Sequence, residues 1–211
     1  EHEKASLQAC LGEVVNKLST STLQDEGILS KCNVNIVQMK EITEYHNYQS
    51  ELSFLTTDTD RMDYISGLIK KISESGNTLV LVDRIKSGKQ ICKNLPEASF
   101  VSGEMKTLKR KDHYDEINEG TNEIVVATYG VAAVGINIPR IFNMVLLEPG
   151  KSFVRVIQSI GRGVRKASDK DHVEIWDIAS TAKYSKRHLR ERKKFYKEAE
   201  FPYTIEKVDY K

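Results

Sequence analysis

The sequence predicts an α/β fold in which a parallel β-sheet carries helices on both faces. Segments rich in branched apolar residues alternate along the chain with segments of helical periodicity. Strands separated by helices of this length form right-handed βαβ units, and such units build a parallel sheet. Most of the strand-like segments are apolar throughout, which is typical of strands buried on both faces. They are TLVLV (78–82), ASFV (98–101), EIVVAT (123–128), NMVLLE (143–148) and HVEIWDI (172–178).

Helix-like segments precede and separate these strands. The segment DTDRMDYISGLIKKISESG (58–76) has aspartates at its start and a glycine at its end, and both residue types commonly cap helices. Its apolar residues recur at helical spacing and form one stripe, made of Met62, Ile65, Ile69 and Ile72. Further helices are expected over SGKQICKNL (87–95), TLKRKDHYDEINEG (107–120), SFVRVIQSIGRGVRK (152–166) and 181–203.

The composition indicates a soluble globular protein with local basic patches. Of 211 residues, 39% are hydrophobic and 29% are charged, which leaves enough apolar content for a core. No apolar run reaches the about 18 residues of a membrane span, so no membrane partner is expected. The net charge is only +2, but basic residues cluster in 158–166 and 181–203. Local clusters of this kind favour nucleic-acid binding more than the total charge does.

The cysteines argue against a structural metal site. Cys10, Cys32 and Cys92 form no CxxC pair, and no histidine lies near them at metal-ligand spacing. A scattered set of this kind is typical of free thiols in a reducing compartment. We therefore expect no metal ligands in this chain and a cytoplasmic location.

The stretch QSIGRGVRK (158–166) contains glycines that invite comparison with phosphate-binding loops. It does not fit the dinucleotide pattern GxGxxG, because Lys166 stands at the third glycine position and no strand directly precedes it. The nearest approach to the Walker A loop GxxxxGK[ST], DRIKSGKQ (83–90), differs at its first and last positions. No apolar strand ends in Asp-Glu, so these routes give the chain no complete nucleotide-hydrolysing site of its own.

As a helix, the same stretch has two distinct sides. Gln158, Arg162 and Arg165 fall in one narrow sector, at spacings i, i+4 and i+7. A neighbouring apolar sector that includes Val154 and Ile157 can pack on the sheet. The residues alone leave two interpretations open, a solvated basic helix end or a pair of arginines directed at a neighbouring active site.

Four segments together resemble the second RecA-like domain of superfamily 2 helicases. QSIGRGVR (158–165) is similar to the family's motif VI, QxxGRxxR, and IVVATYGVAAVGINIP (124–139) resembles motif V. TLVLVDRIKSGKQI (78–91) resembles motif IV, and VSGEM (101–105) the short Ser-Gly motif. They occur in the family's order, and the basic tail and the form of motifs V and VI resemble the phage UvsW type of recombination DNA helicase. For a phage protein the cytoplasm would be that of the host.

The resemblance implies an ATP site shared between two domains. Arg162 and Arg165 would be arginine fingers that reach the γ-phosphate, and Gln158 would hydrogen-bond to it or to a partner motif. Gly135 and Asn137 would border the nucleotide, although Asn137 replaces the family's usual aspartate. ATP and Mg²⁺ would be held mainly by an N-terminal RecA-like domain in cis.

The resemblance also implies a track for one nucleic-acid strand along the strand-to-helix loops. Backbone amides and basic side chains there would hold phosphates without reading sequence. DNA is the expected partner, with RNA as an open alternative. The residues implied are Thr128, Tyr129, Ser102, Gly103, Arg84 and Lys86.

These observations predict three parts and one principal function. Residues 1–50 would be an entry segment from a missing N-terminal RecA-like domain, 51–180 the helicase C-terminal RecA-like domain, and 181–211 a basic helical extension. The chain would be the C-terminal motor domain of an ATP-dependent DNA helicase or translocase that acts on forks, junctions or R-loops, and it would be inactive alone. The alternatives are a non-catalytic nucleic-acid-binding or annealing module with the same fold and, less favoured because GxGxxG is missing, a dehydrogenase.

Overall fold

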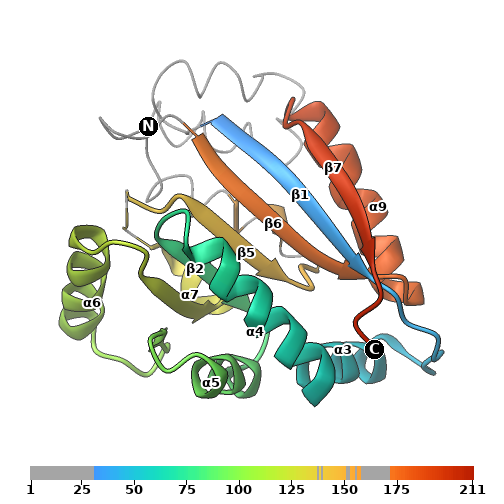
Figure 1. The fold of residues 1–211 in the computed structure, drawn as a ribbon, viewed down its shortest axis with the longest axis horizontal. Helices are drawn as coiled ribbons and strands as arrows, with labels where there is room; N and C mark the ends of the chain where they lie inside the picture. The colour runs from blue at the N-terminus through green and yellow to red at the C-terminus, as the bar shows by residue number, and fades with distance from the viewer. Residues whose placement is uncertain (1–30, 137, 139, 151–152, 155, 158–171) are drawn as a thin grey trace.

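A computed structural model describes residues 31–136, 138, 140–150, 153–154, 156–157 and 172–211. Within these residues, seven strands form one sheet in the order β3-β4-β2-β5-β6-β1-β7, and every neighbouring pair is parallel (Figure 1). The strands are β1 (Lys31–Met39), β2 (Thr78–Val82), β3 (Ser99–Val101), β4 (Ile124–Thr128), β5 (Asn143–Leu147), β6 (His172–Ser180) and β7 (Tyr203–Val208). The helices are α3 (Tyr48–Thr57), α4 (Thr59–Ser73), α5 (Ile85–Asn94), α6 (Thr107–Glu119), α7 (Tyr129–Val134) and α9 (Lys183–Glu198). The predicted α/β fold with a parallel sheet is confirmed.

The sheet buries side chains on both faces, as its continuously apolar strands predict. In β2, Leu79 and Leu81 join the core on one face, with α6, α7 and α9, while Val80 and Val82 join the core on the other face, with α4 and α5. In Figure 1, α4 lies in front of the sheet and α9 lies beside and behind β7. The predicted stripe on α4 is fully buried against the sheet, since it comprises Met62, Ile65, Ile69 and Ile72 at 5% exposure or less.

The sheet extends beyond the predicted domain boundaries. Within the predicted entry segment 1–50, the sequence leaves NVNIV (33–37) open as a strand of the sheet or a bridge to the upstream part. In the structure β1 pairs there with β6 over nine residues and with β7 on its other side. Strand β7 falls in the range 181–211, which was expected to be only helical. Its exposed middle residues leave little apolar signal, because an edge strand is covered by the sheet on one side only.

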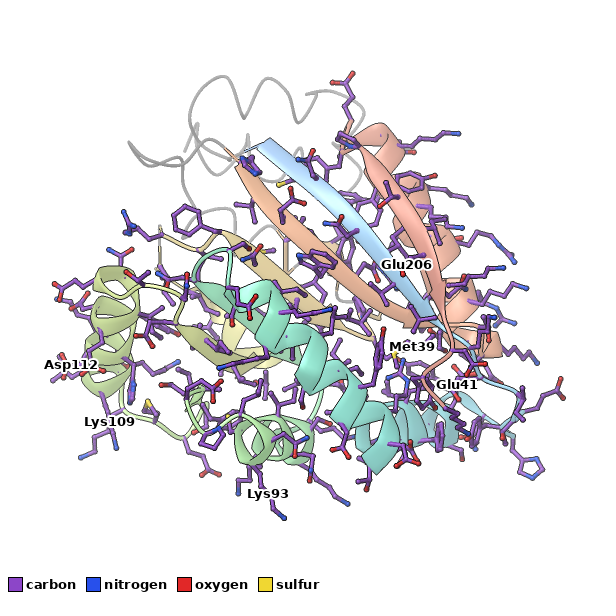
Figure 2. All side chains as sticks on the ribbon, in the orientation of Figure 1. Met39, Glu41, Lys93, Lys109, Asp112 and Glu206 are labelled. Atoms are coloured by element: carbon purple, nitrogen blue, oxygen red, sulfur yellow. The ribbon has the colours of Figure 1, made fainter. Side chains whose placement is uncertain are left out.

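A buried ion pair joins four elements where β5 ends. Glu148 directly follows β5 and accepts hydrogen bonds from Arg61 Nη2 of α4 at 2.6 Å and from Ser185 Oγ of α9 at 2.7 Å. Arg61 also lies 3.3 Å from Glu41, which follows β1 (Glu41 and Met39 are labelled in Figure 2). Burial raises the pKa of the Glu148 carboxyl, and the Arg61 charge opposes that rise. The strands β1 and β5 and the helices α4 and α9 are thereby tied together.

A second buried ion pair fixes α9 to the turn after β5. Arg192 binds Asp177 of β6 through Nε and Nη2, each at 2.8 Å, and its Nη1 donates to the carbonyl of Pro149 at 2.6 Å. The Tyr196 hydroxyl donates to the same carboxylate at 2.6 Å, and burial holds the pKa of this phenol well above its ordinary value. Basic side chains in such a helix are usually solvated, but Arg192 points into the protein and is 3% exposed.

The start of α9 is held by a carboxylate from another helix. Glu51 of α3, which is 2% exposed, accepts hydrogen bonds from the backbone N–H groups of Tyr184 at 3.0 Å and Ser185 at 2.8 Å. A carboxylate at a helix N-terminus satisfies free amide donors and complements the helix dipole. Helices α3 and α9 therefore meet at the carboxyl edge of the sheet in a fixed arrangement.

We predict that Arg192→Ala lowers the free energy of unfolding by about 3–5 kcal/mol, because it leaves the Asp177 carboxylate buried without its cation. Lys197→Ala removes a charge from an exposed position on the same helix and should change that free energy by at most about 0.5 kcal/mol. Urea unfolding followed by the fluorescence of Trp176, the single tryptophan, measures both. Equal small losses in the two variants would show that the Asp177 pair is not a structural clamp.

Candidate functional site

Three of the predicted track loops lie side by side at the carboxyl edge of the sheet. Strand register pairs Val101 of β3 with Ala127 of β4, and Val82 of β2 with Thr128 of β4. The loops that begin at Ser102, Thr128 and Asp83 are therefore neighbours. In parallel α/β sheets this edge is where ligands bind.

Thr128 ends β4 and caps the short helix α7. Its Oγ1 accepts a hydrogen bond from the backbone N–H of Val131 at 3.3 Å, and its side chain is half-buried. A hydroxyl that accepts one bond still has a proton to donate. Thr128 can therefore donate to a phosphate oxygen while it holds the start of α7.

Tyr129 does not have the role predicted for it. Its side chain is 9% exposed, and its hydroxyl donates to the carbonyl of Leu147 at 2.9 Å. Burial raises the pKa of this phenol well above its ordinary value, so it stays a neutral donor. The ring packs in the core beneath α7 and cannot stack on a base, so the side chain of Tyr129 is not part of the track.

Arg84 and Lys86 begin helix α5 next to Thr128. The Arg84 guanidinium lies 3.4 Å from Ser53 Oγ of α3 and 3.7 Å from the Asp83 carboxylate, and it remains 36% exposed. Lys86 is exposed and has no ion pair with the described residues. Arg84 and Lys86 thus remain compatible with the predicted track.

The glycine in the Walker-like stretch DRIKSGKQ has a packing role. A Cβ at Gly88 would lie 2.2 Å from Cε2 of Phe100, so only glycine lets α5 approach β3 this closely. The structure thus gives Gly88 a role in packing α5 against β3.

The loop after β3 exposes its backbone. Ser102 is half-buried and its carbonyl accepts from Met105 N at 3.2 Å, while Gly103 is exposed with open space at its Cβ position. Such a turn can present amide and hydroxyl donors to a phosphate. Ser102 and Gly103 therefore stay compatible with the predicted track.

Gly135 ends α7 in a conformation that favours glycine, with φ at +123° and ψ at 140°. Its N–H is shared by the carbonyls of Val131 and Ala132, so it has no amide to offer a nucleotide. The Cβ position is open, so Gly135 fits a nucleotide only as a wall that permits close approach. The other residues implied for ATP, Asn137, Gln158, Arg162 and Arg165, lie outside the described residues.

The described residues contain neither a cluster of metal ligands nor a membrane-spanning helix. No group of three or more His, Cys, Asp or Glu side chains in them could hold a metal ion. None of their helices has both the length and the apolar character that a membrane crossing requires.

Sequence reasoning missed the charged residues that support this edge. Glu148 ends an apolar strand just before Pro149 and Gly150, and Arg192 lies three residues after Leu189 and three before Phe195, on the apolar stripe of α9. A charge on an apolar stripe signals a buried pair. That signal was present in both cases.

We predict opposite stability effects for two glycines in motif V. Gly135→Ala should lower the free energy of unfolding by about 1–3 kcal/mol, because its φ is unfavourable for any other residue. Gly130→Ala, inside α7 where the nearest atom to a new Cβ is 3.7 Å away, should raise it by about 0.5–1 kcal/mol through helix propensity. Chemical denaturation measures the free energy of unfolding of both variants. Equal changes in the two variants would contradict the prediction.

Comparison with known proteins agrees with this geometry. The chain is 28% identical over 195 residues to the ATP-dependent DNA helicase UvsW of phage T4, covering 87% of the chain and 39% of that protein. The crystal structure of T4 UvsW superposes with a TM-score of 0.75 at 24% identity, over 87% of this chain and 42% of that one. Dbp5 of Saccharomyces cerevisiae, solved with RNA and ADP BeF₃, gives 0.57 at 16% identity, over 90% of this chain and 44% of that one. This chain thus spans about two fifths of T4 UvsW.

The family is set by a match to the helicase conserved C-terminal domain over residues 60–167, which is just over half of the chain. The matched range contains β2, β3, β4 and β5 and the stretch QSIGRGVR. The RecA-like fold that the sequence predicted is shown by the T4 UvsW superposition. The chain belongs to the family of helicase conserved C-terminal domains, and it is similar to part of T4 UvsW.

Proposed function

We propose that this chain is the second motor domain of an ATP-dependent DNA helicase or translocase that acts on branched DNA such as forks, junctions or R-loops. It would supply one wall of a nucleic-acid track and the arginine fingers of an ATP site completed by an N-terminal RecA-like domain. The proposal rests on the family membership and on the similarity to T4 UvsW, a protein named as an ATP-dependent DNA helicase.

The observation that carries the track is the alignment of three strand ends. Ser102, Thr128 and Arg84 follow adjacent strands in register, and two of them, Thr128 and Arg84, present polar groups beside exposed Lys86. These groups are hydrogen-bond donors and cations suited to phosphates, and phosphate contacts position a strand without reading its sequence. A surface of this kind holds a strand and lets it slide.

The arginines that would act at the ATP site belong to the segment that follows the Pro149 turn. Phe153 begins the described part of that segment and makes edge-to-face contacts with Phe195 at 5.4 Å and Tyr196 at 5.6 Å. Arg192, on the same helix as Phe195 and Tyr196, donates a hydrogen bond to the Pro149 carbonyl. Helix α9 thereby fixes the start of the segment that leads to Arg162 and Arg165.

Bound ATP with Mg²⁺ would supply a hydrolysable γ-phosphate. Phosphoryl transfer spreads negative charge over the equatorial oxygens, and an arginine brought in from across a cleft stabilises that charge. Arg165, Arg162 and Gln158 would act there, while Gly135 lets the neighbouring domain come close. Closing and reopening of the cleft would then move the track against the strand.

We predict that Arg165→Ala lowers DNA-stimulated ATPase by about 10³-fold or more when the chain is joined to its N-terminal RecA-like domain. Lys93→Ala, which removes an exposed charge from the last turn of α5, should leave the rate unchanged (Lys93 is labelled in Figure 2). Steady-state phosphate release with and without single-stranded DNA measures both. If Arg165→Ala hydrolyses ATP at the parental rate, the chain is better described as a non-catalytic binding or annealing module.

We also predict that the 211-residue chain alone has negligible ATPase and binds DNA weakly and with strong salt dependence, since phosphate contacts release counterions. Arg84→Ala should reduce the slope of log affinity against log salt by about 1. Fluorescence anisotropy across a salt series gives this slope, again with Lys93→Ala as the control. Binding that does not change with salt would contradict a phosphate-tracking edge.

A further inference from the structure

A cavity lies on the carboxyl edge of the sheet beyond the predicted track. It has a volume of about 490 Å³ and is bounded by the start of α3, the turn at Gly150 and one side of α9. This is within the range of about 300–1,000 Å³ that small-molecule sites occupy. Its walls include the rings of Tyr48, Tyr184 and His188, which are half-buried.

The three rings form one aromatic group. Tyr48 meets His188 at 5.1 Å and Tyr184 at 6.0 Å between ring centroids, both edge to face. Arg187 lies 5.5 Å and Lys183 5.4 Å from the Tyr184 ring. Aromatic faces flanked by cations are the usual platform for unpaired bases.

The cavity is continuous with the track through α3. Tyr48, on the wall of the cavity, is the first residue of α3. Farther along the same helix, Ser53 Oγ accepts a hydrogen bond from the Arg84 guanidinium at 3.4 Å. A strand that leaves Arg84 along α3 therefore reaches the aromatic group next.

A second hollow, of about 440 Å³, adjoins the first across Arg187. It is lined by four exposed cations of α9, which we call the α9 cations: Lys183, Lys186, Arg187 and Arg190. None of them has an ion pair with a described residue. Many nitrogen-tipped side chains project from α9 away from the sheet (Figure 2).

Carboxylates near the α9 cations do not neutralise them. The Glu41 carboxylate pairs with Arg61 at 3.3 Å and accepts a hydrogen bond from the Tyr210 hydroxyl at 2.7 Å. Glu191 pairs with Lys194 at 3.4 Å. That leaves Glu44 on the wall of the second hollow. The hollow therefore carries an excess of positive charge.

The α9 cations do not stabilise the start of their own helix. They occupy the first two turns of α9, where the helix dipole opposes positive charge. The helix start is already capped by the Glu51 carboxylate. A structural role would favour acidic residues in the first turn, and α9 has none there. An anionic ligand accounts for the excess charge.

We propose that the aromatic cavity holds one unpaired base of a nucleic-acid strand and that the α9 cations hold the adjoining phosphate. Arg187, which lines both hollows, joins the two parts of this site. The inference rests on the proposed function, because the strand is the one that crosses the track, and it adds a contact outside the helicase motifs. Binding of an unpaired nucleotide in this cavity would be useful to a motor that works where duplex and single strand meet.

The test measures binding of the 211-residue chain to fluorescein-labelled oligothymidylate and to an abasic oligomer of equal length. Tyr184→Ala should weaken oligothymidylate binding about 5- to 150-fold and leave abasic binding unchanged. Tyr184→Phe keeps the ring and should bind both oligomers like the parent. Arg187→Ala should weaken binding to both and reduce the salt slope by about 1.

Lys197→Ala, at the far end of α9, is the charge control, and Arg84→Ala tests the track in the same assay. If Arg84→Ala weakens binding while Tyr184→Ala matches Lys197→Ala, the base site is overturned and the track stands. Equal losses in Tyr184→Ala and Tyr184→Phe, or equal losses on both oligomers, also overturn it. Thymidine monophosphate that binds as tightly as the oligomer would show a free-nucleotide site instead. A chain that binds neither oligomer refutes the base site and the track together.

Discussion

The carboxyl ends of β5 and β6 are held by two buried ion pairs, and the geometry of the candidate site depends on them. Arg61 meets Glu148, and Arg192 meets Asp177 and the Pro149 carbonyl. Such pairs gain little net energy, because desolvation of the charges offsets their attraction, but a half-broken pair is costly. Glu148 has a φ of 44°, an uncommon conformation for a non-glycine residue that its two hydrogen-bond partners hold in place. The pairs thus specify one position for the turn.

This arrangement divides the edge of the sheet into two regions. At β3, β4 and β2 the strand ends carry open loops with donors and cations for a phosphate chain. At β5, β6 and β1 the strand ends are closed by α3, α4 and α9 around the ion pairs. The aromatic cavity lies beside the second region, so its rings are supported by the same helices that hold the Pro149 turn. The same helices therefore border the proposed base site and hold the turn that leads to the arginine-bearing segment.

Much of the fold could be predicted from the sequence, because buried parallel strands leave runs such as TLVLV and IVVAT that few other structures explain. Helix α4 could also be predicted, from its apolar stripe and its capping residue Asp58. Strand β7 could not be predicted, since four of its six residues are exposed. The inward orientation of Arg192 was missed because a basic segment is normally read as solvated, and only pairing with Asp177 makes its burial favourable.

The structure adds the positions of the predicted site residues, and their roles stay predictions. Order and spacing of the motifs placed Ser102, Thr128 and Arg84 on neighbouring strand ends, and the register agrees. Tyr129 shares the motif of Thr128, but strand-to-helix geometry turns its ring into the core, which no local pattern reveals. The aromatic cavity joins Tyr48 to Tyr184 across more than a hundred residues, so only the folded chain brings them together.

The central claim is that this domain is one half of an ATP-driven motor whose edge carries a nucleic-acid strand. An experimental structure of the chain joined to its N-terminal RecA-like domain, with single-stranded DNA and a γ-phosphate mimic, tests it most directly. The account predicts the Arg165 guanidinium within hydrogen-bond distance of the mimic and strand phosphates along Ser102, Thr128 and Arg84. A structure with the strand bound elsewhere and Arg165 facing solvent would contradict it.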